Sequence, residues 1–170
     1  MSKAMKAVFF DRDGTLNVDK SYLYKIEDLE WMPEALEALA YLAGKGYLLF
    51  VVTNQSGIAR GYYTLEQMQL LHGYMAATAA AAGAAIEKFY YCPHLQEGSV
   101  PKYSIPCTCR KPQPGMLLQC FREYDIDREA SFMIGDGQRD VECAQNAGIK
   151  GYLYSGGSLL ELVKKLVPQA

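Results

Sequence analysis

Acidic residues that could bind a metal ion or attack phosphorus follow three short apolar runs in this sequence. The three motifs, in chain order, are Asp11-Arg12-Asp13-Gly14-Thr15-Leu16-Asn17, Thr53-Asn54-Gln55-Ser56-Gly57 and Gly135-Asp136-Gly137-Gln138-Arg139-Asp140. If the runs are parallel strands, the motifs meet at the carboxyl ends of the strands, where open α/β sheets bind ligands. The four carboxylates brought together there would repel one another without a cation, and hard oxygens suit Mg²⁺. We therefore predict a magnesium site formed by Asp11, Asp13, Asp136 and Asp140.

The aspartates also have a purely structural interpretation. Asp-Gly pairs commonly form turns, and an aspartate often caps a helix. That role would suit any one of these residues taken alone. Three polar clusters at the ends of three separate apolar runs favour a shared site instead.

The apolar runs alternate with helical patterns along the chain. Strands are predicted at 7–10, 47–52, 86–91, 131–134 and 152–154. Helices are predicted at 33–43, 65–82, 116–124, 138–147 and 159–167, and Thr64 with Gln67 predicts a capping box before the second of them. Strands that are apolar on both faces and alternate with helices indicate the α/β class, a Rossmann-like three-layer αβα sandwich with a parallel sheet.

Length and composition limit the classes of function. A chain of 170 residues and 18.9 kDa fits a single domain over residues 1–170, and 50% apolar with 21% charged residues is typical of a globular protein. Seventeen basic and nineteen acidic residues give a net charge of −2, which argues against nucleic-acid or anionic-membrane partners. We expect a monomer with a small-molecule substrate.

The amino-terminal segment does not have the pattern of an export signal. The apolar run after Lys3 and Lys6 stops at Asp11, and the alanine-rich stretch 75–86 is too short for a membrane span. We therefore expect a cytoplasmic protein. His72 is expected at the surface.

Cysteines gather in the one long irregular stretch, residues 92–115. That stretch offers three sulfurs and an imidazole, the ligand set of a closed tetrahedral zinc site: Cys92, His94, Cys107 and Cys109. The alternative is four unrelated reduced side chains. Zinc is favoured because long loops without secondary structure need bracing, and we expect a structural rather than a catalytic ion. Cys120 and Cys143 lie in helical patterns and are expected to be buried.

The order of the motifs resembles that of the haloacid dehalogenase (HAD) superfamily of phosphotransferases. The matching positions are Asp11-x-Asp13-Gly14-Thr15, Thr53, Lys111 and Gly135-Asp136-x-x-x-Asp140. The resemblance implies that Asp11 is the nucleophile, that Asp13 is the general acid and base, and that Thr53 and Lys111 stabilise the transferring phosphoryl group. It also implies Mg²⁺ bound by the Asp11 side chain, the Asp13 backbone carbonyl and Asp136, with Asp140 behind them.

Longer segments, together with the cysteine pattern, resemble the heptose 1,7-bisphosphate 7-phosphatases and the related histidinol-phosphate phosphatases. This resemblance implies a capless HAD core with a zinc-braced loop at 92–109. Loops would then select the substrate, and the implied contacts are Asp19, Tyr22, Thr53, Asn54, Gln55, Ser56, Arg110 and Lys111. Lys20-Ser21 and Gly137 depart from the family pattern, so this sequence lacks the phosphate-reaching cation that the family has at this place. Lys20 or Arg139 could supply the charge instead.

The expected activity is removal of the 7-phosphate of a heptose bisphosphate through an aspartyl phosphate, in the synthesis of ADP-heptose for the lipopolysaccharide core. Both the substrate and the pathway rest on resemblance alone. One alternative is a histidinol-phosphate or other small-molecule phosphatase with the same mechanism. Another is a phospho-accepting receiver-like signalling domain, which also uses Asp, Thr and Lys on a parallel sheet. That class gives no reason for Asp13 or for the zinc ligands.

Overall fold

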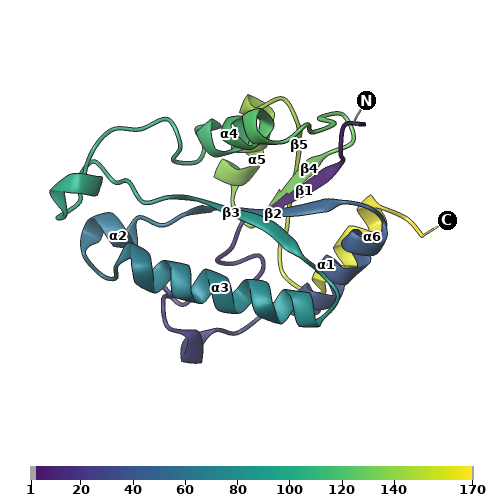
Figure 1. The fold of residues 1–170 in the computed structure, drawn as a ribbon, viewed down its shortest axis with the longest axis horizontal. Helices are drawn as coiled ribbons and strands as arrows, with labels where there is room; N and C mark the ends of the chain where they lie inside the picture. Colours follow the sequence, from purple (N-terminus) through teal and green to yellow (C-terminus); the bar gives the residue numbers. More distant parts are fainter. Residues whose placement is uncertain (1–2, 170) are drawn as a thin grey trace.

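A sheet of five parallel strands forms the centre of the protein in a computed structural model that describes residues 3–169. The strands are β1 (Ala7–Phe10), β2 (Leu48–Asn54), β3 (Ile86–Cys92), β4 (Phe132–Gly135) and β5 (Lys150–Leu153). Their order across the sheet is β3-β2-β1-β4-β5, so that β1 lies in the middle (Figure 1). The chain turns to the other half of the sheet after β3, and the carboxyl ends of β1 and β4 flank that change of direction.

Helices cover both faces of the sheet (Figure 1). One face packs against α1 (Ala35–Gly44), α3 (Leu65–Ala81) and α6 (Leu159–Leu166). The other packs against α4 (Gly115–Glu123) and α5 (Gln138–Asn146). The predicted three-layer αβα sandwich is therefore confirmed, and the capping box at Thr64 and Gln67 begins α3 as expected.

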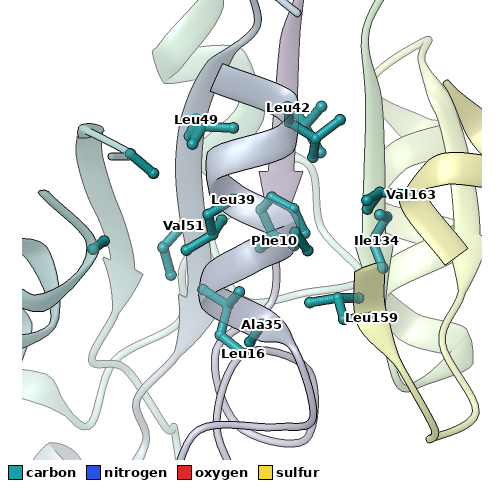
Figure 2. Close-up of a cluster of buried hydrophobic side chains, with 14 of the residues drawn as sticks. Phe10, Leu16, Ala35, Leu39, Leu42, Leu49, Val51, Ile134, Leu159 and Val163 are labelled. Carbon is teal, nitrogen blue, oxygen red and sulfur yellow. The ribbon is translucent and has the colours of Figure 1, made fainter. Parts of the chain in front are cut away.

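The central strand alternates its side chains between two hydrophobic cores. Val8 and Phe10 belong to the core beneath α1, α3 and α6, whereas Phe9 belongs to the core beneath α4 and α5. Figure 2 shows Phe10 among the side chains of Leu39 and Leu42 from α1. Burial on both faces explains why β1 is an unbroken apolar run. It also holds the residue that follows the strand at a fixed place in the molecule.

The fifth strand differs from its predicted position. It covers Lys150–Leu153 rather than 152–154, although Tyr154 still donates its backbone N–H to Gly135 O at 2.7 Å. The apolar pattern hides the start of the strand because Gly151 contributes no side chain. Glycine is needed there, since a Cβ would lie 2.9 Å from Val141 Cα where α5 crosses the strand.

Three short elements were not predicted from the sequence. The helix α2 (Gly57–Arg60) and the 3₁₀ turns η1 (Ile26–Asp28) and η2 (Pro101–Tyr103) are too brief to show a hydrophobic period. The long loop after β3 carries η2 and rests on α2, where Ser99 and Val100 donate their backbone N–H groups to Ala59 O at 2.8 and 2.9 Å. Within residues 3–169, no helix has both the length and the apolarity to cross a membrane.

Candidate active site

The acidic motifs meet at the carboxyl ends of the neighbouring strands β1 and β4, as predicted, but the carboxylate of Asp13 pairs with Arg12 and lies outside the cluster that it was predicted to join. Asp11 directly follows β1, and its backbone N–H donates to Ile134 O of β4 at 3.0 Å. Asp136 and Asp140 follow β4. Carboxylate oxygens of these three residues lie within 4.8 Å of one another.

A buried ion network forms the floor of the site. Lys111 Nζ lies 2.7 Å from Asp11 Oδ1 and 2.7 Å from Asp140 Oδ1, and it also donates to Val52 O at 2.8 Å. Lys111 and Asp140 are almost fully buried, so this cation has exchanged water for three fixed oxygens. A network of this kind depends on its single cation, because removal of Lys111 would leave two buried carboxylates uncompensated.

Burial and charge set the protonation of the network. Burial raises the pKa of Asp11 from 3.8 to about 7, with Asp140 adding to the rise and Lys111 opposing it. Burial alone would lower the pKa of Lys111, but the carboxylates of Asp11 and Asp140 outweigh it and raise that pKa above its ordinary value. The network therefore keeps a cation and leaves one carboxylate easily protonated.

The surroundings of Asp136 suit a divalent cation. Unlike Asp11 and Asp140, Asp136 is exposed, so its carboxylate can coordinate an ion that is also accessible to solvent. Gly14 has a φ of +87°, and a Cβ at this position would overlap the Asp136 carboxylate. The loop after β1 thus brings its backbone against Asp136. Clustered carboxylate and backbone oxygens are the ligands that Mg²⁺ prefers, and the residues present fit this ion.

Asp13 is held by nitrogen donors on both carboxylate oxygens. Its Oδ1 accepts hydrogen bonds from Arg12 Nη2 at 2.9 Å, from Arg12 Nε at 3.3 Å and from Asn17 Nδ2 at 3.0 Å. Its Oδ2 accepts one from Gln55 Nε2 at 3.2 Å. The side chain is 23% exposed, and Asp13 lines the central cavity. Asp13 is thus a fixed carboxylate within reach of a ligand near Asp11.

The end of β2 supports the site from beneath. Thr53 is buried, and its hydroxyl accepts a hydrogen bond from Gln55 Nε2 at 2.9 Å. Tyr63 donates its hydroxyl to Gln55 Oε1 and so fixes the other end of that amide. The Asn54 side chain pairs with the Lys111 backbone in both directions, accepting from its N–H at 3.0 Å and donating to its carbonyl at 3.3 Å. Asn54 therefore positions the backbone of Lys111.

A polar cavity of about 370 Å³ opens above Asp11. Most of the substrate contacts implied by resemblance line it, namely Asp19, Tyr22, Asn54, Gln55, Ser56, Arg110 and Lys111, whereas Thr53 does not. Arg60 and Arg139 also line it. Lys20 instead pairs with Glu30 at 3.2 Å and is absent from the lining. Of the two replacement cations considered from the sequence, Arg139 is the one at the cavity.

The predicted zinc ligands converge at the base of the loop that follows β3. His94 Nδ1 lies 3.5 Å from Cys92 Sγ and 3.3 Å from Cys109 Sγ, while Cys107 Sγ lies 3.6 Å from Cys92 Sγ. The Cys109 thiol donates to Cys92 Sγ at 2.7 Å, and this bond lowers the pKa of Cys92 to about 5. Three sulfurs and one imidazole nitrogen facing a common point fit zinc. Cys120 and Cys143 are buried, as predicted.

Sequence reasoning missed several residues around the site. His72 is buried rather than at the surface, because it faces the guanidinium of Arg12 in the loop that follows β1. The sequence marks Arg12 only by its position between two motif aspartates. The burial of Arg12 depends on tertiary packing, which no local pattern shows. Tyr63 and Arg60 reach the cavity only because the short helix α2 turns the chain back toward it.

Comparison with known proteins found relatives with similar sequences and similar structures. Residues 108–165 match the family described as HAD-hydrolase-like. The D-glycero-β-D-manno-heptose-1,7-bisphosphate 7-phosphatase of Pasteurella multocida is 47% identical over 85% of this chain and 78% of its own, and that of Escherichia coli K12 is 40% identical over 100% and 86%. The D,D-heptose 1,7-bisphosphate phosphatase of B. bronchiseptica, solved with magnesium and phosphate, has a TM-score of 0.80 at 31% identity and covers 95% of this chain and 87% of its own.

Proposed function

Because this chain belongs to the family of the D-glycero-β-D-manno-heptose-1,7-bisphosphate 7-phosphatases, within the HAD-like hydrolases, we propose that it removes the 7-phosphate of D-glycero-D-manno-heptose 1,7-bisphosphate. The chain is a phosphatase. The observation that carries the proposal is the buried Lys111 cation, bound to Asp11 at the floor of a polar cavity. Removal of this phosphate would serve the synthesis of ADP-heptose for the lipopolysaccharide core.

The first half of the proposed reaction uses Asp11 and Asp13. An Asp11 oxygen attacks the 7-phosphorus and forms an aspartyl phosphate, while the bond from phosphorus to O7 of the sugar breaks. Asp13 gives its proton to O7 as that oxygen leaves. Lys111 and Thr53 stabilise the transferring oxygens, a role supported by the short distance from Lys111 Nζ to the nucleophile.

The second half releases phosphate. Asp13, now a carboxylate, accepts a proton from water as the water oxygen attacks the aspartyl phosphate, and Asp11 is regenerated. The Asp11 and Asp136 side chains and the Asp13 backbone carbonyl would hold Mg²⁺, with Asp140 behind them. When bound, this ion would neutralise the repulsion between the nucleophile and the phosphate oxygens.

We propose a separate structural role for zinc at Cys92, His94, Cys107 and Cys109. Four protein ligands leave no position for water, which suits a brace and not a catalyst. The brace lies next to the site, because Arg110 and Lys111 follow Cys109 directly. Arg110 has a planar fork suited to a substrate phosphate, and it lines the cavity. Arg139 gives the cavity a further cation.

We further propose that the whole chain acts as one cytoplasmic, monomeric domain on a small sugar phosphate. None of the five cysteines, all within the described residues, forms a disulfide, which suits a reducing compartment. The even balance of charges supports a small-molecule substrate over a nucleic acid or a membrane surface.

A screen for phosphate release tests the proposed substrate. The protein with Mg²⁺ is assayed on heptose 1,7-bisphosphate, histidinol phosphate and simple sugar phosphates. We expect the highest kcat/KM on the heptose bisphosphate, with heptose 1-phosphate as product. Preference for histidinol phosphate would overturn the substrate assignment. A single equivalent of phosphate taken up from a chemical phosphodonor, without turnover, would favour the receiver-like alternative.

The raised pKa of Asp11 predicts a pH-dependent stabilisation by Mg²⁺. Below an ordinary pKa of 3.8 the carboxyl is protonated in both the folded and unfolded states, but between 3.8 and about 7 the metal-free folded protein alone keeps the proton. This contribution to stability is therefore lost as the pH rises toward 7. Mg²⁺ binds the ionised form, so the increase in Tm that it causes should be larger at about pH 8 than at about pH 5.5.

Asp11→Asn is the matched control for this measurement. The amide has no proton to release, so most of the pH dependence of the Mg²⁺ effect should disappear. An equal pH dependence in the variant and the wild type would assign it to another group.

Cys109→Ser tests the brace. The substitution should loosen Arg110 and Lys111 together, so kcat should fall and KM should rise, as expected when both positioning and binding are disturbed. The main thermal transition should fall only modestly, because the strands lie mostly outside residues 92–109. Zinc analysis, steady-state kinetics and thermal unfolding give the three readouts. If zinc is lost and the kinetic constants do not change, the loop does not influence the site and the proposed coupling is wrong.

Matched serine substitution of Cys120 controls for the loss of a thiol. This residue belongs to α4, is buried in the core between that helix and the sheet, and lies outside the Cys and His cluster. Cys120→Ser should keep zinc and both kinetic constants. If Cys109→Ser unfolds globally and Cys120→Ser does not, the whole fold requires zinc.

A further inference from the structure

Arg12 is a fully buried arginine inside the catalytic loop, between Asp11 and Asp13. Burying a guanidinium is costly unless its N–H groups find acceptors. Its Nη2 donates to Asp13 Oδ1 at 2.9 Å and to Leu23 O at 3.0 Å, and its Nη1 lies 3.1 Å from His72 Nε2. Acceptors from three separate segments therefore fix the position of this charge.

His72 provides the acceptor that lies farthest away in the sequence. It belongs to α3, is 6% exposed and stacks on the ring of Phe89, with a centroid distance of 4.3 Å and an interplanar angle of 16°. Burial, with a contribution from Arg12, lowers the pKa of His72 well below 6.5, so the imidazole is neutral. Since arginine always donates, Nε2 of the neutral ring accepts and the ring proton lies on Nδ1.

We propose that Arg12 and His72 form a positioning pair that holds the Asp13 carboxyl group in place to protonate the leaving oxygen. The inference rests on the general-acid role proposed above for Asp13. Within residues 3–169, the carboxylate paired with Arg12 is the partly exposed one of Asp13. Here the fixed guanidinium directs one Asp13 oxygen inward and leaves Oδ2 toward Gln55 and the cavity.

The pair acts on one step of the reaction. As the Asp11 oxygen bonds to phosphorus, the bond from phosphorus to the leaving oxygen breaks, and the Asp13 proton moves to that oxygen. An alkoxide leaving group needs this proton, whereas a dinitrophenolate leaves without it. A misplaced Asp13 should therefore slow alkyl phosphates selectively, because proton transfer depends on the position of the acid.

Substitution of His72 tests the pair. His72→Phe keeps a ring to stack on Phe89 but removes the acceptor, and His72→Gln keeps an acceptor at a similar reach. The values of kcat/KM are measured on aryl phosphates with a graded series of leaving groups and on a sugar phosphate. We expect His72→Phe to lose about 10- to 100-fold on the sugar phosphate and less than about twofold on 2,4-dinitrophenyl phosphate. His72→Gln should restore much of the loss.

Met75→Leu is the matched control, since Met75 is a buried residue of the same helix, outside the site. It should leave the dependence on the leaving group unchanged even if it lowers Tm. If His72→Phe does not fold, His72→Ala removes the same acceptor and should give the same selectivity. An equal loss on all substrates, or no loss, would overturn the pair.

Asp13→Asn separates failure of the pair from failure of the proposed mechanism. It should itself steepen the dependence on the leaving group, with a loss of about 10²- to 10⁴-fold on the sugar phosphate. If it does so and the His72 variants do not, the general-acid role stands and the positioning pair is wrong. If Asp13→Asn shows no such dependence, the role of Asp13 fails first. Turnover of the heptose bisphosphate by the wild type reports on the proposed substrate independently.

Discussion

The Asp11→Asn variant should fold normally and lose turnover by on the order of 10⁴-fold or more. An amide cannot attack phosphorus, so no aspartyl phosphate forms. Stability should be kept or slightly raised, because burial already opposes the charge of Asp11, as its raised pKa indicates. Lys111 retains Asp140 and Val52 O as partners. Phosphate release and urea unfolding measure the two effects.

Trapping of the phosphorylated protein sharpens this test. Rapid acid quench of the wild type with substrate should leave phosphate attached to the chain, and the variant should carry none. Substantial turnover by a correctly folded Asp11→Asn protein would sink the covalent mechanism.

Lys111→Met should have the second large effect, on both stability and activity. Methionine fills much of the space of the lysine side chain but leaves two buried carboxylates, Asp11 and Asp140, without their cation. Removing one partner of a buried ion pair typically costs about 3–5 kcal/mol in the free energy of unfolding. Catalysis should also be lost, because the cation paired with the nucleophile no longer stabilises the transferring oxygens. Urea unfolding and phosphate release measure both.

The pH dependence of the loss in stability caused by Lys111→Met shows whether charge or packing is responsible. Below neutral pH the stranded carboxylates can take up protons, so the destabilisation relative to the wild type should shrink. The double variant Lys111→Met with Asp11→Asn should recover part of the lost stability but none of the activity. A cost that is the same at all pH values would point to packing instead of charge.

The motifs that follow strands were predictable from the sequence because strand ends are marked by local patterns. Asp11 and Asp136 each follow an apolar run, and the parallel sheet brings such ends together. Cys92 ends β3, so the start of the zinc loop was also marked.

The layers beneath the site could not be read from the sequence. The hydrogen bond from Arg12 to His72 joins residues sixty positions apart, and it depends on how α3 packs against the sheet. His72 lies in an ordinary helical pattern, where a polar residue is usually solvated. The shifted start of β5 has the same origin, since only the crossing of α5 explains why Gly151 belongs to a strand.

The middle position of β1 has a consequence for how the protein is made on the ribosome. β1 is the first strand synthesised, yet one of its two neighbours is β4, more than a hundred residues later in the chain. Contacts of such long range form late and slowly. Until β4 and α5 have emerged, Asp11 lacks Asp136 and Asp140, and a nascent chain cannot complete its carboxylate cluster. Catalytic competence therefore arrives in one late step, after three strands and their helices have already been synthesised.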